Sequence, residues 1–238
     1  MTTAPVAGVS DTPVTATRSG IGHALPLGAA GFAWCSLTLG LSTVGALSAA
    51  GSSMILPGTF FYGGIVQLVA AFFALAAGAT FAAAFMGAYG AFWLGYSAIN
   101  VWVAPHIVAG VMASKAAAPQ VLAAQAGHDV AQALGVFLVG WLVVTVIFTI
   151  ASLGTNAATV TAFLLLDLTI VLLMIAYLGA TSAGAAQSGA LHAAGYAEIV
   201  LAAVAFYIVL AELANETLGK AIFPLFPIKR LASSGGAA

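Results

Sequence analysis

Two carboxyl groups lie inside otherwise apolar segments of the sequence. Asp167 is in "FLLLDLTIVLL" and Glu198 is in "AGYAEIVLAA". An ionised carboxylate at the centre of a membrane-spanning helix costs at least ~2.5–3.5 kcal/mol, so such a group faces protein or water. Each acid therefore either fixes two helices together by a hydrogen bond or belongs to a transport path, and both interpretations stay open. Gln67, in "YGGIVQLVAAFF", either bonds across helices or lines a polar pocket.

Other kinds of chemistry have no support in the sequence. There is no phosphate-binding G-x-x-x-x-G-K-[ST] loop, no G-x-S-x-G or H-E-x-x-H element and no cluster with metal-ligand spacing. The one cysteine, Cys35, cannot form a disulfide or a Cys-based metal site within the chain. We expect no enzyme activity, no cofactor and no metal. The four histidines lie near predicted segment ends, where an interfacial or structural role is the usual one: His23, His106, His128 and His192.

The composition places these residues in membrane helices. The 238 residues are 63% hydrophobic and 5% charged, whereas a soluble domain carries about 25% charged residues. The chain has no Lys/Arg cluster, so we expect no nucleic-acid partner. We expect its helices to be surrounded by membrane lipid. Runs of about 20 apolar residues predict an all-α, polytopic protein with six membrane helices. We place them at about 26–48, 58–77, 80–104, 131–152, 158–178 and 190–213, and we expect the long connection 105–130 to lie partly in the membrane interface.

The segments outside the helices predict the orientation. Residues 1–22 and 220–238 are expected to be tails around a membrane domain at 23–219. Arg18, Lys220, Lys229 and Arg230 flank the termini, whereas Lys115 lies alone in the opposite loop. The positive-inside rule then puts both termini in the cytoplasm, for a protein of the inner (plasma) membrane.

Small residues recur along the predicted helices at intervals of about four, as in "GAAGFAWCSLTLG". They let helix backbones approach closely, either within one bundle or between subunits. Twenty-seven glycines exceed what one six-helix bundle obviously needs. We therefore expect a symmetric homo-oligomer.

Four stretches resemble the acetate uptake transporter family, which includes the bacterial succinate-acetate permease. They are "LPLGAAGF" (25–32), "FYGGIVQLVAA" (61–71), "GATFAAAFMGAYGAFW" (78–93) and "ELANETLG" (212–219). The family patterns are roughly N-P-A-P-L-G-L, Y-G-G-x-x-Q, G-N-T-F-x-x-x-A-F-x-S-Y-G-x-F-W and E-x-x-N-E. The four matches follow the same order and spacing over residues 23–219.

The resemblance implies a function and a site. Members are six-helix subunits of hexamers, each with a path for small monocarboxylates, coupled to protons or channel-like. The family's narrowest ring of Phe, Leu and Tyr falls on Phe32, Leu166 and Tyr89 here. The ring offers an apolar slot for a methyl group, with the Tyr89 hydroxyl, Ser36 and Gln67 as candidate donors to a carboxylate. Phe85, Phe92 and Trp93 are expected to pack.

Several positions depart from the family pattern. In the first motif, His23 and Ala24 stand in place of the family's Asn and first Pro. Leu25 replaces its Ala, and Ala29 replaces its last Leu. In the third motif, "GATF" replaces "GNTF" and "AYG" replaces "SYG". Asp167 and Glu198 stand where the family pattern has uncharged residues. Asp167 points about 100° away from Leu166 around a helix and so toward a neighbouring helix. We expect Asp167 to be protonated or proton-exchanging, with the last helix as one candidate partner, and we treat Glu198 as a second proton-linked candidate.

The sequence thus predicts a transporter or channel for acetate, succinate and related short carboxylates, with a proton as the coupled partner. Two alternatives stay open. One is a pathway for ammonia or ammonium, and the other is a membrane scaffold or sensor that carries no flux.

Overall fold

The protein is a bundle of membrane-length helices. The computed structural model describes residues 22–48, 50–181 and 186–228, and in this part the chain is all-helical. Six helical segments are long and apolar enough to cross a membrane, as predicted: Leu25–Thr43 (α1), Gly51–Ala76, Thr80–Ala113, Pro119–Ser152 (α6), Ala157–Leu178 (α7) and Ser188–Leu218 (α8). The predicted tails at 1–22 and 220–238 lie outside the described residues, apart from residues 22 and 220–228.

Two of the six segments change their helical winding along their length. The second consists of η1 (Gly51–Ile55), α2 (Leu56–Gly58), the π-helical η2 (Thr59–Val66) and α3 (Gln67–Ala76). The third consists of α4 (Thr80–Ala98), the π-helical η3 (Ile99–Val103) and α5 (Ala104–Ala113). Between α3 and α4 the chain reverses at Gly78, whose φ of +79° favours glycine. The two helices therefore form a tight hairpin.

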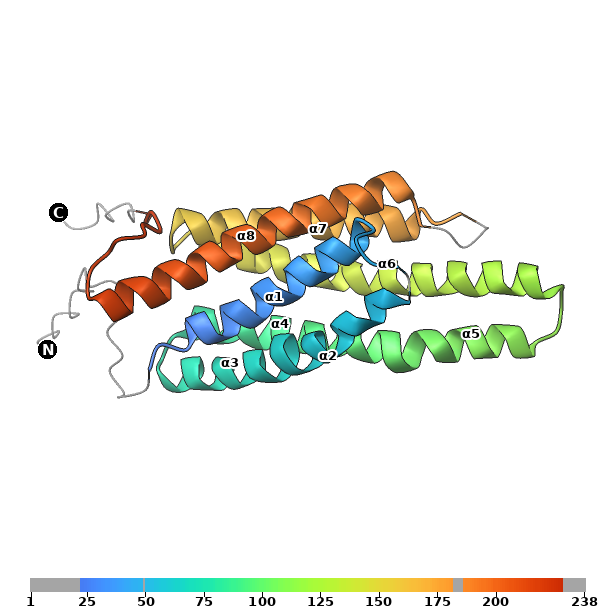
Figure 1. The fold of residues 1–238 in the computed structure, drawn as a ribbon, viewed down its shortest axis with the longest axis horizontal. Coiled ribbons are helices and arrows are strands. Elements are labelled where there is room, and N and C mark those ends of the chain that lie inside the picture. Colours follow the sequence, from blue (N-terminus) through green and yellow to red (C-terminus); the bar gives the residue numbers. More distant parts are fainter. Residues whose placement is uncertain (1–21, 49, 182–185, 229–238) are drawn as a thin grey trace, which may run out of the picture.

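The first and last helices pack closely against each other (Figure 1). A Cβ atom at Gly40 would stand 2.9 Å from the carbonyl oxygen of Gly195, so the absence of side chains permits this approach. At the other end of the pair, His23 Nδ1 lies 3.4 Å from Glu212 Oε2. Leu25 and Leu218 therefore lie at the same end of the bundle, as an even number of crossings requires.

Most of the connection at 105–130 is helical, beyond the bounds that we predicted for the third and fourth membrane helices. The third segment continues as helix to Ala113, and α6 begins at Pro119. Both segments have 34 residues, about 50 Å of helix against a hydrocarbon core of roughly 30 Å. Together, α5 and the first part of α6 project side by side beyond the rest of the bundle (Figure 1).

Part of the predicted carboxy-terminal tail is docked on the bundle. After α8 the chain turns back across the start of α7, where Ala157 N donates to Phe226 O (2.9 Å) and Ile228 N donates to Thr155 O (3.1 Å). The Tyr207 hydroxyl on α8 donates to Pro224 O (2.7 Å). We call residues 222–228 the strap.

Candidate functional site

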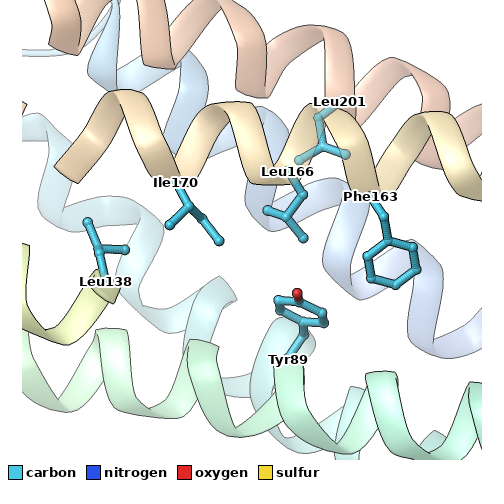
Figure 2. Packing of buried hydrophobic residues seen from close by; sticks show 6 residues of the cluster. All are labelled: Tyr89, Leu138, Phe163, Leu166, Ile170 and Leu201. Atoms are coloured by element: carbon cyan, nitrogen blue, oxygen red, sulfur yellow. The ribbon is translucent and has the colours of Figure 1, made fainter. Parts of the chain in front are cut away.

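The structure brings the three predicted constriction residues together from three helices. Tyr89 on α4 and Leu166 on α7 belong to one buried cluster, and Phe32 on α1 packs against it. Figure 2 shows Tyr89 and Leu166 pointing toward one another from facing helices. The rings of Phe32 and Tyr89 meet edge to face, with their centroids 5.4 Å apart. Because Tyr89 is 2% exposed and Leu166 9% exposed, the ring is closed in this structure.

Aromatic side chains surround the Tyr89 ring. Phe148, Phe163, Trp141 and Phe92 all lie with ring centroids 6.1 to 6.4 Å from it. Aromatic pairs at such distances add packing energy to the burial of their area. The surroundings of Tyr89 are therefore apolar and tightly filled.

The other rings of the stretch 85–93 pack as expected. Phe85 lies against Phe163 at a centroid distance of 5.8 Å. Trp93 stands edge to face with Phe92 (5.0 Å) and with Phe32 (6.3 Å). These rings hold the walls of the constriction.

The Tyr89 hydroxyl is hydrogen-bonded to a residue that the sequence did not single out. Its Oη lies 2.8 Å from Thr145 Oγ1 on α6, and the same Oγ1 donates to the carbonyl oxygen of Trp141 (2.8 Å). The available signal was the pair Thr145 and Thr149 in "WLVVTVIFTIAS", two hydroxyls four residues apart on one face of an apolar helix. That spacing does not say which helix they face.

The two other predicted substrate donors are buried on neighbouring helices. Ser36, one turn beyond Phe32 on α1, is 1% exposed, and Gln67 on α3 is fully buried. Neither amide atom of Gln67 makes a hydrogen bond within the described residues. One turn before Gln67, a Cβ at Gly63 would stand 2.9 Å from the Trp93 ring, so this helix face lies against α4. The Gln67 amide is thus an uncommitted polar group in the apolar interior.

The partner of Asp167 lies on α6, one turn from the Thr145 that contacts Tyr89. Its Oδ2 accepts a hydrogen bond from Thr149 Oγ1 at 2.6 Å, whereas Oδ1 has no hydrogen-bond partner in the described part of the chain. The sequence suggested the last helix, α8, as one candidate partner. The hydrogen bond to Thr149 assigns the contact to α6.

Glu198 lies on α8 and is 4% exposed, with no hydrogen bond to its Oε2 from any described residue. Across residues 22–48, 50–181 and 186–228, no hydrogen bond joins Glu198 to Asp167. None of the described helices contains Lys or Arg, so neither acid has a fixed cation on them. The same residues contain no group of three His, Cys, Asp or Glu side chains that could hold a metal ion.

Comparison with known proteins gives a family and several relatives. The sequence profile described as the GPR1/FUN34/yaaH family matches residues 9–230. Acetate permease A of Emericella nidulans is 29% identical over 202 residues, covering 84% of this chain and 64% of its own length. The succinate-acetate/proton symporter SatP of Escherichia coli is 30% identical over 200 residues, covering 84% of this chain and 93% of its own. The chain thus spans less than two thirds of the length of the fungal permease.

A solved structure is also similar. It is described as that of the bacterial acetate channel SatP, and it superposes with a TM-score of 0.67 at 28% sequence identity. The match covers 86% of this chain and 98% of the other. The relatives are described as a permease, a symporter and a channel, and none of these is an enzyme.

Proposed function

The chain belongs to the GPR1/FUN34/yaaH family, and on that premise we propose that it is a membrane transporter or channel for acetate and related short-chain carboxylates. The observation that carries the proposal is the convergence of Phe32, Tyr89 and Leu166 in one closed cluster. These residues come from three helices, so a small movement between the helices opens or closes the ring.

The chemistry of the site suits a ligand with one apolar and one polar end. Phe32 and Leu166 supply apolar walls for a methyl group. Ser36, Gln67 and Tyr89 carry polar groups that are buried in the same bundle, and we assign them to contact with the carboxyl group. The uncommitted Gln67 amide is the strongest of these assignments, because a buried amide without a partner gains a full hydrogen bond from a ligand.

We further propose coupling to a proton, by analogy with the relative described as a proton symporter. The proton has two candidate carriers, a membrane carboxyl group or the substrate itself. Glu198 is buried in α8, and Asp167 is half-buried in α7 with a hydrogen bond from Thr149.

The proposed assembly is a homo-oligomer in the inner (plasma) membrane, a hexamer by family resemblance, with both termini in the cytoplasm. Glycines with open space around them support contacts between subunits. Three such glycines are Gly110, Gly140 and Gly189. Apart from the neighbouring backbone of its own helix, no atom lies within 4 Å of a Cβ added at any of them. Small residues on such outer faces permit close approach of a neighbouring helix.

Uptake of labelled acetate tests the function. Cells expressing the protein should take up labelled acetate faster than cells without it, and unlabelled propionate or succinate should compete. An uncoupler should abolish accumulation if a proton is coupled. Competition by ammonium instead of carboxylates would favour the ammonium pathway. A folded oligomer that carries no small carboxylate in liposomes would favour a scaffold or sensor.

A further inference from the structure

The proton of the Tyr89 hydroxyl is already donated to a hydrogen bond within the protein. Thr145 Oγ1 lies 2.8 Å from Tyr89 Oη and 2.8 Å from the carbonyl oxygen of Trp141. A hydroxyl group has one proton to donate, and a carbonyl oxygen can only accept. Thr145 can donate either to Trp141 O or to Tyr89 Oη, and in the second case the Tyr89 proton has no acceptor among the described residues. Both protons are satisfied only if Thr145 donates to Trp141 O and accepts from Tyr89, and we assign that arrangement. Tyr89 is the donor of that bond.

What remains on the Tyr89 oxygen is a lone pair. A group that enters the ring beside Phe32 and Leu166 meets apolar side chains and, at Tyr89, a hydrogen-bond acceptor. A carboxylate anion consists of acceptors only, so it gains nothing from this oxygen. An undissociated carboxylic acid has an O–H group that can donate to it.

The charges on the surrounding helices also disfavour a carboxylate anion at the ring. The histidines of the packed helices lie away from Tyr89: His192 contacts Ser188 O at the start of α8, and His128 lies about 25 Å along α6 from Thr145. The other titratable side chains on these helices include Cys35 on α1, Asp167 on α7 and Glu198 on α8, together with tyrosines. Each is either neutral or negative. On α6, Thr145, Trp141 and Phe148 contact Tyr89, and none of them titrates. An anion at the constriction therefore finds no compensating positive charge, and moving it through an apolar ring is costly.

We propose, building on the function proposed above, that the species crossing the ring of Phe32, Tyr89 and Leu166 is the undissociated acid. Its O–H group donates to Tyr89 Oη, and Thr145 sets this preference by holding the Tyr89 proton. The carboxylate takes a proton from water on one side and returns it to water on the other. One proton then moves with each carboxylate, and no net charge crosses.

The first test measures labelled acetate flux in liposomes that contain the purified protein, with the flux of protein-free liposomes subtracted. Above the pKa of a carboxylic acid, the undissociated fraction falls about tenfold for each unit of pH. At fixed total acetate, the protein-dependent flux should fall by the same factor. In planar bilayers the protein should carry no acetate-dependent current.

Variants at position 145 test the role of the hydroxyl. Thr145→Val deletes the acceptor and frees the Tyr89 proton, so a carboxylate can then be bound. We expect a shallower fall of flux with pH and the appearance of an acetate-dependent current. Thr145→Ser keeps the hydroxyl and should behave as wild type. The matched control is Thr169→Val on α7, a buried threonine whose hydroxyl bonds only within its own helix (Leu165 O, 2.9 Å).

The outcomes separate this inference from the proposed function. A wild-type flux that is constant with pH and carries current overturns the inference alone. A folded Thr145→Val protein with the wild-type slope and no current overturns the role of Thr145. If Thr145→Val does not fold, the dependence of the flux on pH in the wild type and in Thr145→Ser still shows which species crosses the ring. No protein-dependent acetate flux at any pH overturns the proposed function, and the inference with it.

Discussion

At the scale of single residues, the carboxyl group of Asp167 has an unusual environment. It lies within a membrane helix, receives one hydrogen bond from Thr149, and has no Lys or Arg on the surrounding helices. Asparagine has nearly the same size, and its Oδ1 can still accept the Thr149 proton. The substitution Asp167→Asn therefore removes the ability to bind and release a proton without removing the contact.

If the proton crosses on the substrate, Asp167→Asn should keep uncoupler-sensitive accumulation of labelled acetate and its dependence on pH. Asn at this position cannot cycle between charged and neutral forms, so a proton carried by Asp167 would be lost. Accumulation that fails while downhill exchange survives would assign the proton to Asp167. The measurement is accumulation and exchange in the same cells, normalised to the amount of protein in the membrane.

Leu166 should limit the size of the substrate. Replacing it with alanine removes bulk from the ring it forms with Phe32 and Tyr89, so larger acids such as succinate or lactate should compete better with labelled acetate. A buried Leu→Ala change costs about 2–5 kcal/mol of stability in soluble cores, so folding must be checked by size-exclusion chromatography. The matched control is Leu168→Ala, because Leu168 is 48% exposed on the same helix. Unchanged selectivity in folded Leu166→Ala protein would argue against the constriction.

The site was partly predictable from residues. Phe32 and Tyr89 could be assigned because they lie in family motifs, and Leu166 by the spacing of the chain between motifs; the structure brings the three together. Thr145 could not be assigned, because its role depends on how α4 and α6 are rotated toward each other. Sequence spacing gives the face of one helix, and the contact between two helices requires their packing.

At the scale of elements, hydropathy predicted the membrane helices because each must bury about 20 apolar residues in lipid. It missed the helical projection after the third segment, because proline, glycine and polar residues at 105–130 resemble a loop. Pro119 begins α6, and Pro105 is at the start of α5 directly after the π-helical η3. At the first turn of a helix, as at Pro119, proline loses no hydrogen bond that the helix needs. Pro105 lies inside the continuous third segment, so both segments extend into the stretch that we predicted to be a connection.

The motif "ELANETLG" contains the residue that holds the strap in place. Asn215 Oδ1 accepts from the backbone N–H groups of Ile222 (2.7 Å) and Phe223 (3.0 Å), and its Nδ2 donates to Phe223 O (2.8 Å). One side chain thus fixes the turn that sends the strap, residues 222–228, across the start of α7. The sequence did not predict this, because these bonds join residues across a turn that no local pattern marks.

Asn215→Ala should release the strap. Three hydrogen bonds are lost at about 1 kcal/mol each or less, since the site is partly open to water. We expect a lower Tm and faster proteolytic cleavage between 219 and 228, with the membrane helices intact. Thr217→Val is the matched control, because the Thr217 hydroxyl bonds only to Leu213 O within α8. Equal cleavage of both variants would contradict the assigned role of Asn215.

At the scale of the whole molecule, the distribution of charge and the two ends of the bundle give a test of orientation. Lys115 lies at the tip of the projection formed by α5 and α6, and Lys220 directly follows α8 at the opposite end (Figure 1). Arg18, Lys229 and Arg230 lie outside the described residues, but in sequence they flank the same end as Lys220. With four cations against one, the positive-inside rule predicts that this end is cytoplasmic.

If this orientation is correct, a single cysteine introduced at Ala116, at the exposed tip of the projection, should react with a membrane-impermeant thiol reagent in intact cells. A cysteine at Ser233, in the carboxy-terminal tail beyond the described residues, should react only after the cells are permeabilised. The native Cys35 is 0% exposed and should contribute little background, and the unsubstituted protein is the control for it. Ala116 is exposed, so poor labelling from the outside could not be attributed to burial within the protein. Labelling at Ala116 only after permeabilisation, with Ser233 accessible in intact cells, would reverse the orientation and put the projection in the cytoplasm.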